Sequence, residues 1–195
     1  MPRFYLENLE LFSLVIYHVS MEHNHDPHFA GFEYLGNAMR FAEEIHEVID
    51  HAPLFDELSF IEIETLCQFM VCYAAPRGSV LMREGDTGDF LIVLLTGRAE
   101  VLKTNTAGET TKIAEVGPGA SLGEMSMIDG QTRFATCLST EPVDFAVLDR
   151  KALNDILISL PRLGNKFLLL LLQLVVGRLR EASTRLLPHI GPLAV

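Results

Sequence analysis

LGEMSMIDGQTRFAT, from Leu122 to Thr136, is the stretch of this sequence that decides its fold. It places Glu124 nine positions before Arg133, with Gly123 directly before the glutamate. A carboxylate accepts a hydrogen bond from a hydroxyl group, and a guanidinium binds a phosphate through two parallel donors. Gly123 lets the backbone come close to a ligand, and a short helix over residues 124–130 would direct free amide groups at the same anion. The stretch therefore predicts a site for a ligand with both a hydroxyl group and a phosphate.

Short β-rich runs separated by glycine turns flank this stretch on both sides. They cover residues 79–83, 90–96, 98–103, 110–116, 134–138 and 143–148. Strands of this length and spacing predict an antiparallel barrel or sandwich. Apolar residues recur at helical spacing over residues 4–16, 32–49 and 59–70, and the chain returns to helix at Asp149. We therefore expect an α+β fold, in which N-terminal helices and a long C-terminal helix flank a jelly-roll-like antiparallel β-roll.

The stretch from Leu122 to Thr136 resembles the phosphate-binding cassette of cyclic nucleotide-binding domains, the family of catabolite activator protein and of cAMP-dependent kinase regulatory subunits. Residues 77–86 and 91–101 look like the first two hairpins of that family, and residues 117–124 look like the approach to its cassette. Cupin barrels share the glycine pattern, but the pattern together with Gly-Glu and the later arginine is specific. The resemblance divides the chain into an N-terminal helical extension (1–52), a cyclic nucleotide-binding domain with its C-terminal helix (53–187) and a tail (188–195).

The resemblance also implies a role for each cassette residue. Glu124 would accept a hydrogen bond from the ribose 2′-hydroxyl, and Arg133 would pair with the cyclic phosphate. Backbone amides between and after them would add hydrogen bonds to the ligand. The implied ligand-binding residues are Leu122, Gly123, Glu124, Met125, Ser126, Thr132, Arg133, Phe134 and Ala135.

Three of these residues depart from the family's pattern. Leu122 stands where phenylalanine is usual, and Thr132 stands where proline is common. Phe134 stands where the family has alanine, serine or threonine, and it has no hydroxyl to offer to a phosphate or a guanine. Its ring would either crowd the pocket or stack on the base. These departures disfavour cGMP, so cAMP is the expected ligand, ahead of cGMP or a cyclic dinucleotide.

The last long helix is predicted to begin after Leu160-Pro161 and to be apolar on two faces. One face is a heptad stripe that consists of Leu168, Leu172, Val175, Leu179, Ala182 and Leu186. The neighbouring face consists of Phe167, Leu170, Leu171 and Leu174. A helix with two apolar faces needs two partners. One is the barrel, and the other is the same helix in a homodimer or the N-terminal helices of the same chain. In the family this helix also closes over the base.

Composition narrows the classes of partner. The net charge of −11 argues against nucleic acid, which requires clustered Lys and Arg. The apolar runs are too short to span a membrane, and the N-terminus lacks the basic start of a signal peptide, so the default location is cytoplasmic. The three scattered cysteines, Cys67, Cys72 and Cys137, are interpreted as reduced core thiols.

We expect a regulatory protein rather than an enzyme, one that binds cAMP and signals through contacts with a protein effector. The eight residues after Leu187 are too few for a DNA-binding module. One alternative is a degenerate member of the family that acts as an interaction scaffold without a ligand. A cupin-like enzyme is disfavoured because no histidine lies between His51 and His189 to bind a metal. The polar loop from His23 to His28 is interpreted as a solvated loop rather than a metal site.

Overall fold

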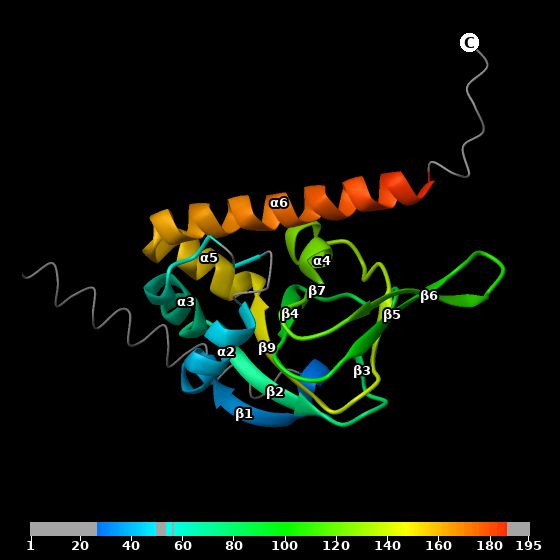
Figure 1. Cartoon of the computed structure of the whole chain (residues 1–195), viewed down its shortest axis with the longest axis horizontal. Helices are drawn as coiled ribbons and strands as arrows, with labels where there is room; N and C mark the ends of the chain where they lie inside the picture. The colour runs from blue at the N-terminus through cyan, green and yellow to red at the C-terminus, as the bar shows by residue number, and fades with distance from the viewer. Residues whose placement is uncertain (1–26, 50–53, 56, 187–195) are drawn as a thin grey trace, which may run out of the picture.

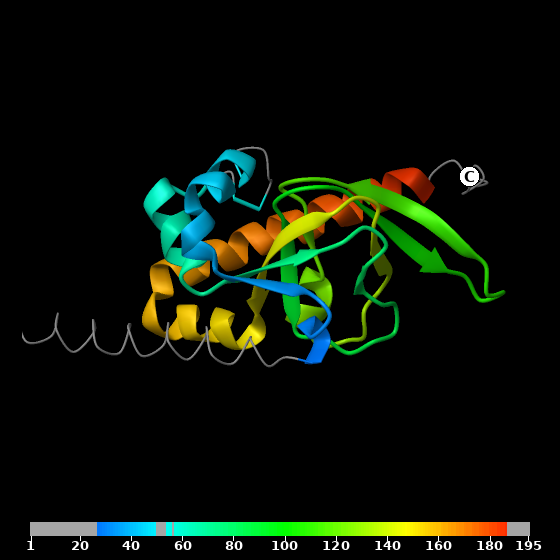
Figure 2. The same ribbon diagram turned by 90° about the horizontal axis from the view of Figure 1, so that it is seen from below.

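The computed structural model describes residues 27–49, 54, 55 and 57–186. Two antiparallel sheets form a β-roll, helices α2, α3 and α5 gather at one end of it, and α6 runs along its length (Figures 1 and 2). One sheet has the order β1 (Glu33–Asn37), β2 (Val71–Ala75), β9 (Val143–Asp149), β4 (Phe90–Leu94) and β7 (Ser121–Leu122). The other has the order β3 (Val80–Met82), β8 (Thr136–Ser139), β5 (Ala99–Thr104) and β6 (Thr110–Val116). The predicted α+β fold with an antiparallel β-roll is confirmed.

The helical elements follow the chain around this roll. They are η1 (Pro27–Phe29), η2 (Ala38–Phe41), α2 (Ala42–Ile49), α3 (Phe60–Cys67), α4 (Glu124–Asp129), α5 (Arg150–Ser159) and α6 (Pro161–Leu186). Helix α3 begins with a capping box, in which the Ser59 backbone amide donates to Glu62 Oε2 at 2.8 Å and the Glu62 amide donates to Ser59 Oγ at 3.4 Å. Asp149 caps α5 by accepting from the Ala152 amide at 2.6 Å.

The predicted strands are present, but their pairing differs from that of the expected hairpins. Strand β3 pairs with β8, while β4 and β5 lie in different sheets. The turn at Gly97 carries the chain from one sheet to the other, with a φ of 70°. A Cβ there would lie 2.1 Å from the carbonyl oxygen of Pro142, so this close crossing requires glycine.

The prediction of one helix over residues 32–49 is wrong in its first part. Residues 33–37 form β1, which pairs with β2, and the helix α2 begins only at Ala42. A bulge between Tyr34 and Gly36 bends the strand, and Gly36 takes a φ of 108° there. Pairing along a sheet edge therefore overrides the helical spacing of the apolar residues. The helix predicted over residues 4–16, the loop from 23 to 26 and the tail 188–195 lie outside the described residues.

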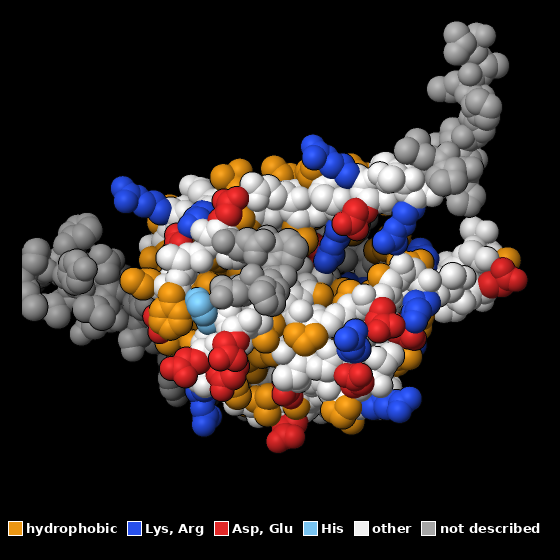
Figure 3. All heavy atoms as spheres, viewed as in Figure 1, with side chains coloured by type: hydrophobic (Ala, Val, Ile, Leu, Met, Phe, Trp, Pro, Cys, Tyr) orange, Lys and Arg blue, Asp and Glu red, His pale blue; other side chains and the backbone are white. Residues whose placement is uncertain are grey.

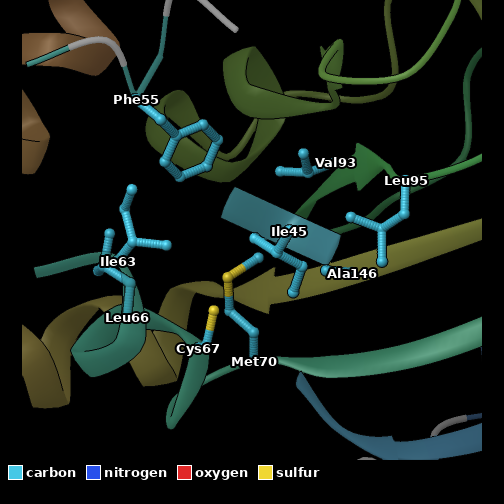
Figure 4. Close-up of a pocket in the computed structure, with 9 residues that line it drawn as sticks. All are labelled: Ile45, Phe55, Ile63, Leu66, Cys67, Met70, Val93, Leu95 and Ala146. Carbon is cyan, nitrogen blue, oxygen red and sulfur yellow. The ribbon is translucent and has the colours of Figure 1, made fainter. Parts of the chain in front are cut away.

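Strand β4 separates two apolar cores because it is buried on both faces. Leu91 and Val93 face the helices, whereas Phe90 and Ile92 face the inside of the roll. The helical core contains one small apolar cavity of about 10 Å³, where Ile45 lies across from Val93 (Figure 4). A space of this size holds about one water at most, so this end of the fold is packed core and not a ligand site.

Helix α6 uses one apolar face within the chain and exposes the other. Phe167, Leu170 and Leu171 are buried in the core that lies between the helices and the sheet. In the heptad stripe, Leu172 is 58% and Leu179 65% exposed, and hydrophobic side chains are visible along α6 on the surface (Figure 3). Despite this apolar character, no helix in the described part of the chain is long and apolar enough to cross a membrane.

Candidate ligand-binding site

The cassette is a tight turn from strand to helix. Gly123 joins β7 to α4 with a φ of 84°, and α4 ends at Gly130 with a φ of 72°. A Cβ at position 123 would lie 2.5 Å from Nη1 of Arg133, so the arginine can reach the turn only because residue 123 is glycine. The first helical hydrogen bond runs from the Met127 amide to the Gly123 carbonyl, so the amides before Met127 have no partner within the helix. The predicted short helix after Gly123 is confirmed and ends at Asp129.

Arg133 is almost fully buried, with 3% of its surface exposed. Its Nη1 donates to the Gly123 carbonyl at 2.9 Å, and its Cζ lies 4.2 Å from the centre of the Phe90 ring. Burial lowers the pKa of the Arg133 guanidinium from its usual value, although nearby Cys137, Asp89 and Glu124 oppose that shift. Arginine remains charged even so, and the site therefore holds a desolvated cation.

Glu124 is 1% exposed and contacts a residue far along the sequence. Its Oε1 accepts a hydrogen bond from Nη1 of Arg178 in α6, and Nη2 of Arg178 donates to the Ser121 carbonyl at 2.5 Å. Sequence reasoning missed Arg178, because its partner lies in a different element. The only hint was the general expectation that this helix closes over the site.

The two charged cassette residues have polar atoms left without partners. In the described part of the chain, four buried side-chain nitrogen or oxygen atoms lack a hydrogen bond. Three of them are Oε2 of Glu124 and Nε and Nη2 of Arg133. Buried polar groups are nearly always paired, and each exception requires an explanation. Their concentration in one cassette indicates a site prepared for a polar ligand.

Phe134 lies at the rim of this site and not in its centre. The side chain is 54% exposed, and the ammonium of Lys103 sits 4.4 Å from the centre of its ring. The same ammonium donates to the Phe134 carbonyl at 2.6 Å and to Glu84 Oε1 at 2.7 Å. Lys103 therefore contacts both the ring and the backbone carbonyl of Phe134, and the Phe134 side chain lines both the cavity and the hollow beside it.

Eight of the nine predicted residues line one cavity of about 90 Å³, which Met82, Val101, Cys137 and Arg178 close on the other sides. The exception is Thr132, which is exposed and lines a neighbouring hollow of about 320 Å³. Sites for small molecules usually measure roughly 300–1,000 Å³, so this cavity by itself is smaller than such a site. No cluster of three or more potential metal ligands occurs among the described residues, and His28, from the predicted solvated loop, interacts with the Leu81 carbonyl at 3.0 Å.

The β-roll, the helical turn after Gly123 and the long helix α6 together form the fold of a cyclic nucleotide-binding domain. The chain belongs to the cyclic nucleotide-binding domain family, and the sequence model of that family matches residues 74–159. A solved cyclic nucleotide-binding domain from Methylobacillus flagellatus KT is 44% identical, covers 88% of this chain and 96% of its own, and superimposes with a TM-score of 0.77.

Curated relatives in two regulatory systems share the same domain. The cyclic AMP receptor protein of Thermus thermophilus is 28% identical over 135 residues, which are 69% of this chain and 61% of that protein. The cAMP-dependent protein kinase regulatory subunit of Yarrowia lipolytica is 27% identical over 116 residues, which are 60% of this chain and 30% of that protein. The chain thus spans less than two thirds of the length of either relative.

Proposed function

We propose that this protein is a regulatory module that binds a cyclic nucleotide, with cAMP as its ligand. The observation that carries the proposal is the set of three unpaired buried atoms on Glu124 and Arg133. A ribose hydroxyl and a cyclic phosphate supply the partners that these atoms lack, a donor for the carboxylate and an anion for the guanidinium.

In this proposal Glu124 uses its two oxygens for different tasks. Oε1 stays with Arg178, and Oε2 accepts a hydrogen bond from the ribose 2′-hydroxyl. Nε and Nη2 of Arg133 bind the cyclic phosphate, and the backbone amides of the cassette add further donors. Burial strengthens each of these interactions, because a desolvated cation gains more from an anion than a hydrated one does.

Two observations favour cAMP over other cyclic nucleotides. The relatives from Thermus thermophilus and Yarrowia lipolytica are named for cyclic AMP. Phe134, at the rim of the cavity, has no hydroxyl with which to select a guanine, and its ring can stack on a base. We therefore place the base beside Phe134 and the phosphate at Arg133.

In this proposal the nucleotide occupies the cavity of about 90 Å³ and enlarges it by moving Phe134 or the part of α6 that carries Arg178. Because Arg178 bonds directly to the Glu124 carboxylate, a ligand at Glu124 biases the position of α6. We propose that α6 passes this change to a protein effector and that its exposed heptad stripe forms a homodimer.

The ligand proposal is tested by calorimetry and thermal shift with cAMP, cGMP and cyclic di-GMP. A ligand at a hundred times its Kd stabilises a single site by about 2.7 kcal/mol, which raises the melting temperature measurably. Arg133→Ala removes the counter-charge of the phosphate and should weaken binding by about 2–4 kcal/mol, or roughly 30- to 900-fold. Arg98→Ala is the matched control, because Arg98 pairs with Glu115 on the exposed surface.

The alternative is a ligand-free interaction scaffold, and the small volume of the cavity is the observation that favours it. If none of the three nucleotides raises the melting temperature, this alternative replaces the proposal. If binding occurs but Arg133→Ala leaves it unchanged, the phosphate site is assigned wrongly.

The dimer proposal has a separate test by light scattering. Leu172→Glu places a charge in the exposed stripe of α6 and should convert a dimer to a monomer. Ile158→Glu is the control, because Ile158 is 81% exposed on the neighbouring helix α5. A wild-type protein that is monomeric at all concentrations would refute the dimer.

A further inference from the structure

A chain of aromatic contacts joins the beginning of the described chain to the arginine of the ligand site. Phe29 in η1 is 3% exposed and stacks on Tyr73, with ring centres 4.6 Å apart. It also leans against Phe90 at 4.8 Å. Phe90 in turn lies 4.2 Å from Cζ of Arg133. Two contacts therefore connect η1 to the guanidinium. Figure 1 shows η1, in blue, on the side of the roll that faces away from α6.

The neighbouring histidine strengthens this connection. The His28 ring lies 4.8 Å from the ring of Phe90, and its Nε2 interacts with the Leu81 carbonyl at 3.0 Å. Leu81 belongs to β3, in the sheet opposite β4. Segment η1 is thus attached to both sheets, and it supports Phe90 with two rings, those of His28 and Phe29.

Arg133 depends on Phe90 because few hydrogen bonds hold its guanidinium. Among the described residues, its guanidinium has one hydrogen bond, to the Gly123 carbonyl, while Nε and Nη2 have none. On another side it lies against Gly88, where a Cβ would be 2.5 Å from Nη2. The Gly88 and Gly123 contacts are to backbone. The Phe90 ring is therefore a side-chain contact that sets the direction of the guanidinium, together with the charges of Asp89 and Glu124. The position of the ring itself depends on η1.

We propose that Phe29 and His28 are positioning residues for ligand recognition: through Phe90, they hold Arg133 where it meets the phosphate. This inference rests on the proposed function of the cassette. It makes nucleotide affinity depend on how well η1 is seated under the roll. Because binding equilibria are reciprocal, nucleotide binding would also stabilise the packing of η1 against the roll. The ligand would then act on η1 as well as on α6.

The test compares Phe29→Leu with Phe32→Leu. Phe32 is the matched control because, among the described residues, it has ring contacts with Phe29 and Phe145 but none with Phe90. Loss of the ring support should weaken cAMP binding by about three- to thirty-fold in Phe29→Leu, with Phe32→Leu within a factor of two of wild type. In a Phe90→Leu background, Phe29→Leu should have no further effect on affinity. The proposal would be overturned if Phe29→Leu and Phe32→Leu weakened cAMP binding equally. It would also be overturned if Phe29→Leu weakened binding as much in the Phe90→Leu background as in wild type.

A second measurement needs no nucleotide. Because Cζ of Arg133 lies 4.2 Å from the centre of the Phe90 ring, the ring current should displace the Nε–Hε resonance of Arg133, and NMR of the ligand-free protein measures that displacement. Phe29→Leu should move the resonance toward the value of an exposed arginine, and Phe32→Leu should leave it in place. An unmoved resonance in Phe29→Leu contradicts the positioning role, even in a protein that binds no nucleotide and so fails the proposed function. If circular dichroism shows that Phe29→Leu is unfolded, His28→Ala tests the same contact with Phe90.

Discussion

Replacement of Arg178 by alanine removes the cation that hydrogen-bonds to the buried Glu124 carboxylate. Removing one partner of a fully buried ion pair costs about 3–5 kcal/mol, whereas an exposed pair contributes at most about 1 kcal/mol. The Glu124 side chain is 2% exposed but that of Arg178 is 38% exposed, so water screens one end of this pair. We therefore expect the free energy of unfolding to fall by roughly 2 kcal/mol, between these limits.

Urea denaturation at pH 7 measures this loss. For a slope near 2 kcal/mol per molar urea, the midpoint should fall by about 1 M. Arg180→Ala is the control, because Arg180 is exposed on the same helix and the change should stay within about 0.5 kcal/mol. In a Glu124→Gln background the carboxylate charge is gone, so Arg178→Ala should cost much less than in wild type. An equal cost in the two backgrounds, or a cost no greater than that of Arg180→Ala, would refute the pairing.

Two further predictions concern the rest of the fold. Burial raises the pKa of the Cys67 and Cys72 thiols to about 12 and that of the Cys137 thiol to about 11. A thiol reagent at pH 8 should therefore label none of these three cysteines until urea unfolds the protein. Rapid labelling of the native protein would contradict this burial. The hydrogen bond from Lys166 is the largest cause that lowers the pKa of Glu62, ahead of the hydrogen bond from the Ser59 amide. The Lys166–Glu62 pair therefore stabilises the fold at a pH above the ordinary glutamate pKa of 4.5. That stabilisation is lost as the pH falls through the lowered pKa of Glu62. Lys166→Ala should therefore lower the free energy of unfolding by under about 1 kcal/mol at pH 7. Thermal melts should show that the difference in stability between this variant and wild type shrinks below pH 4.5. A difference in stability that grows in acid would contradict this pH dependence.

The cassette could be predicted from the sequence because its determinants are local. A glycine with positive φ, the glutamate after it and an arginine nine positions later lie in one turn. The predicted residues therefore line one cavity together, apart from Thr132.

The parts that sequence reasoning missed depend on contacts between distant elements. Arg178 reaches Glu124 from α6, and Phe29 reaches Phe90 from η1, and neither pair has a periodic signal. The position of Phe134 was left open between crowding and stacking, because the outcome depends on Lys103 in another strand. The helical spacing of Phe32 and Leu35 predicts a helix where the structure has β1, because the sequence does not show the edge of β2 with which this segment pairs.

The pairing of β1 with β2 bears on where the domain can be cut. A fragment that starts at residue 53, the predicted boundary, would lose β1 and leave β2 as the edge strand of its sheet. That strand reads Val-Cys-Tyr-Ala-Ala, an uncharged sequence whose freed amides and carbonyls could pair with another molecule. Residues 33–37 thus also cover the edge of β2 that would otherwise be open to another molecule. A fragment made for solution studies should begin before residue 33.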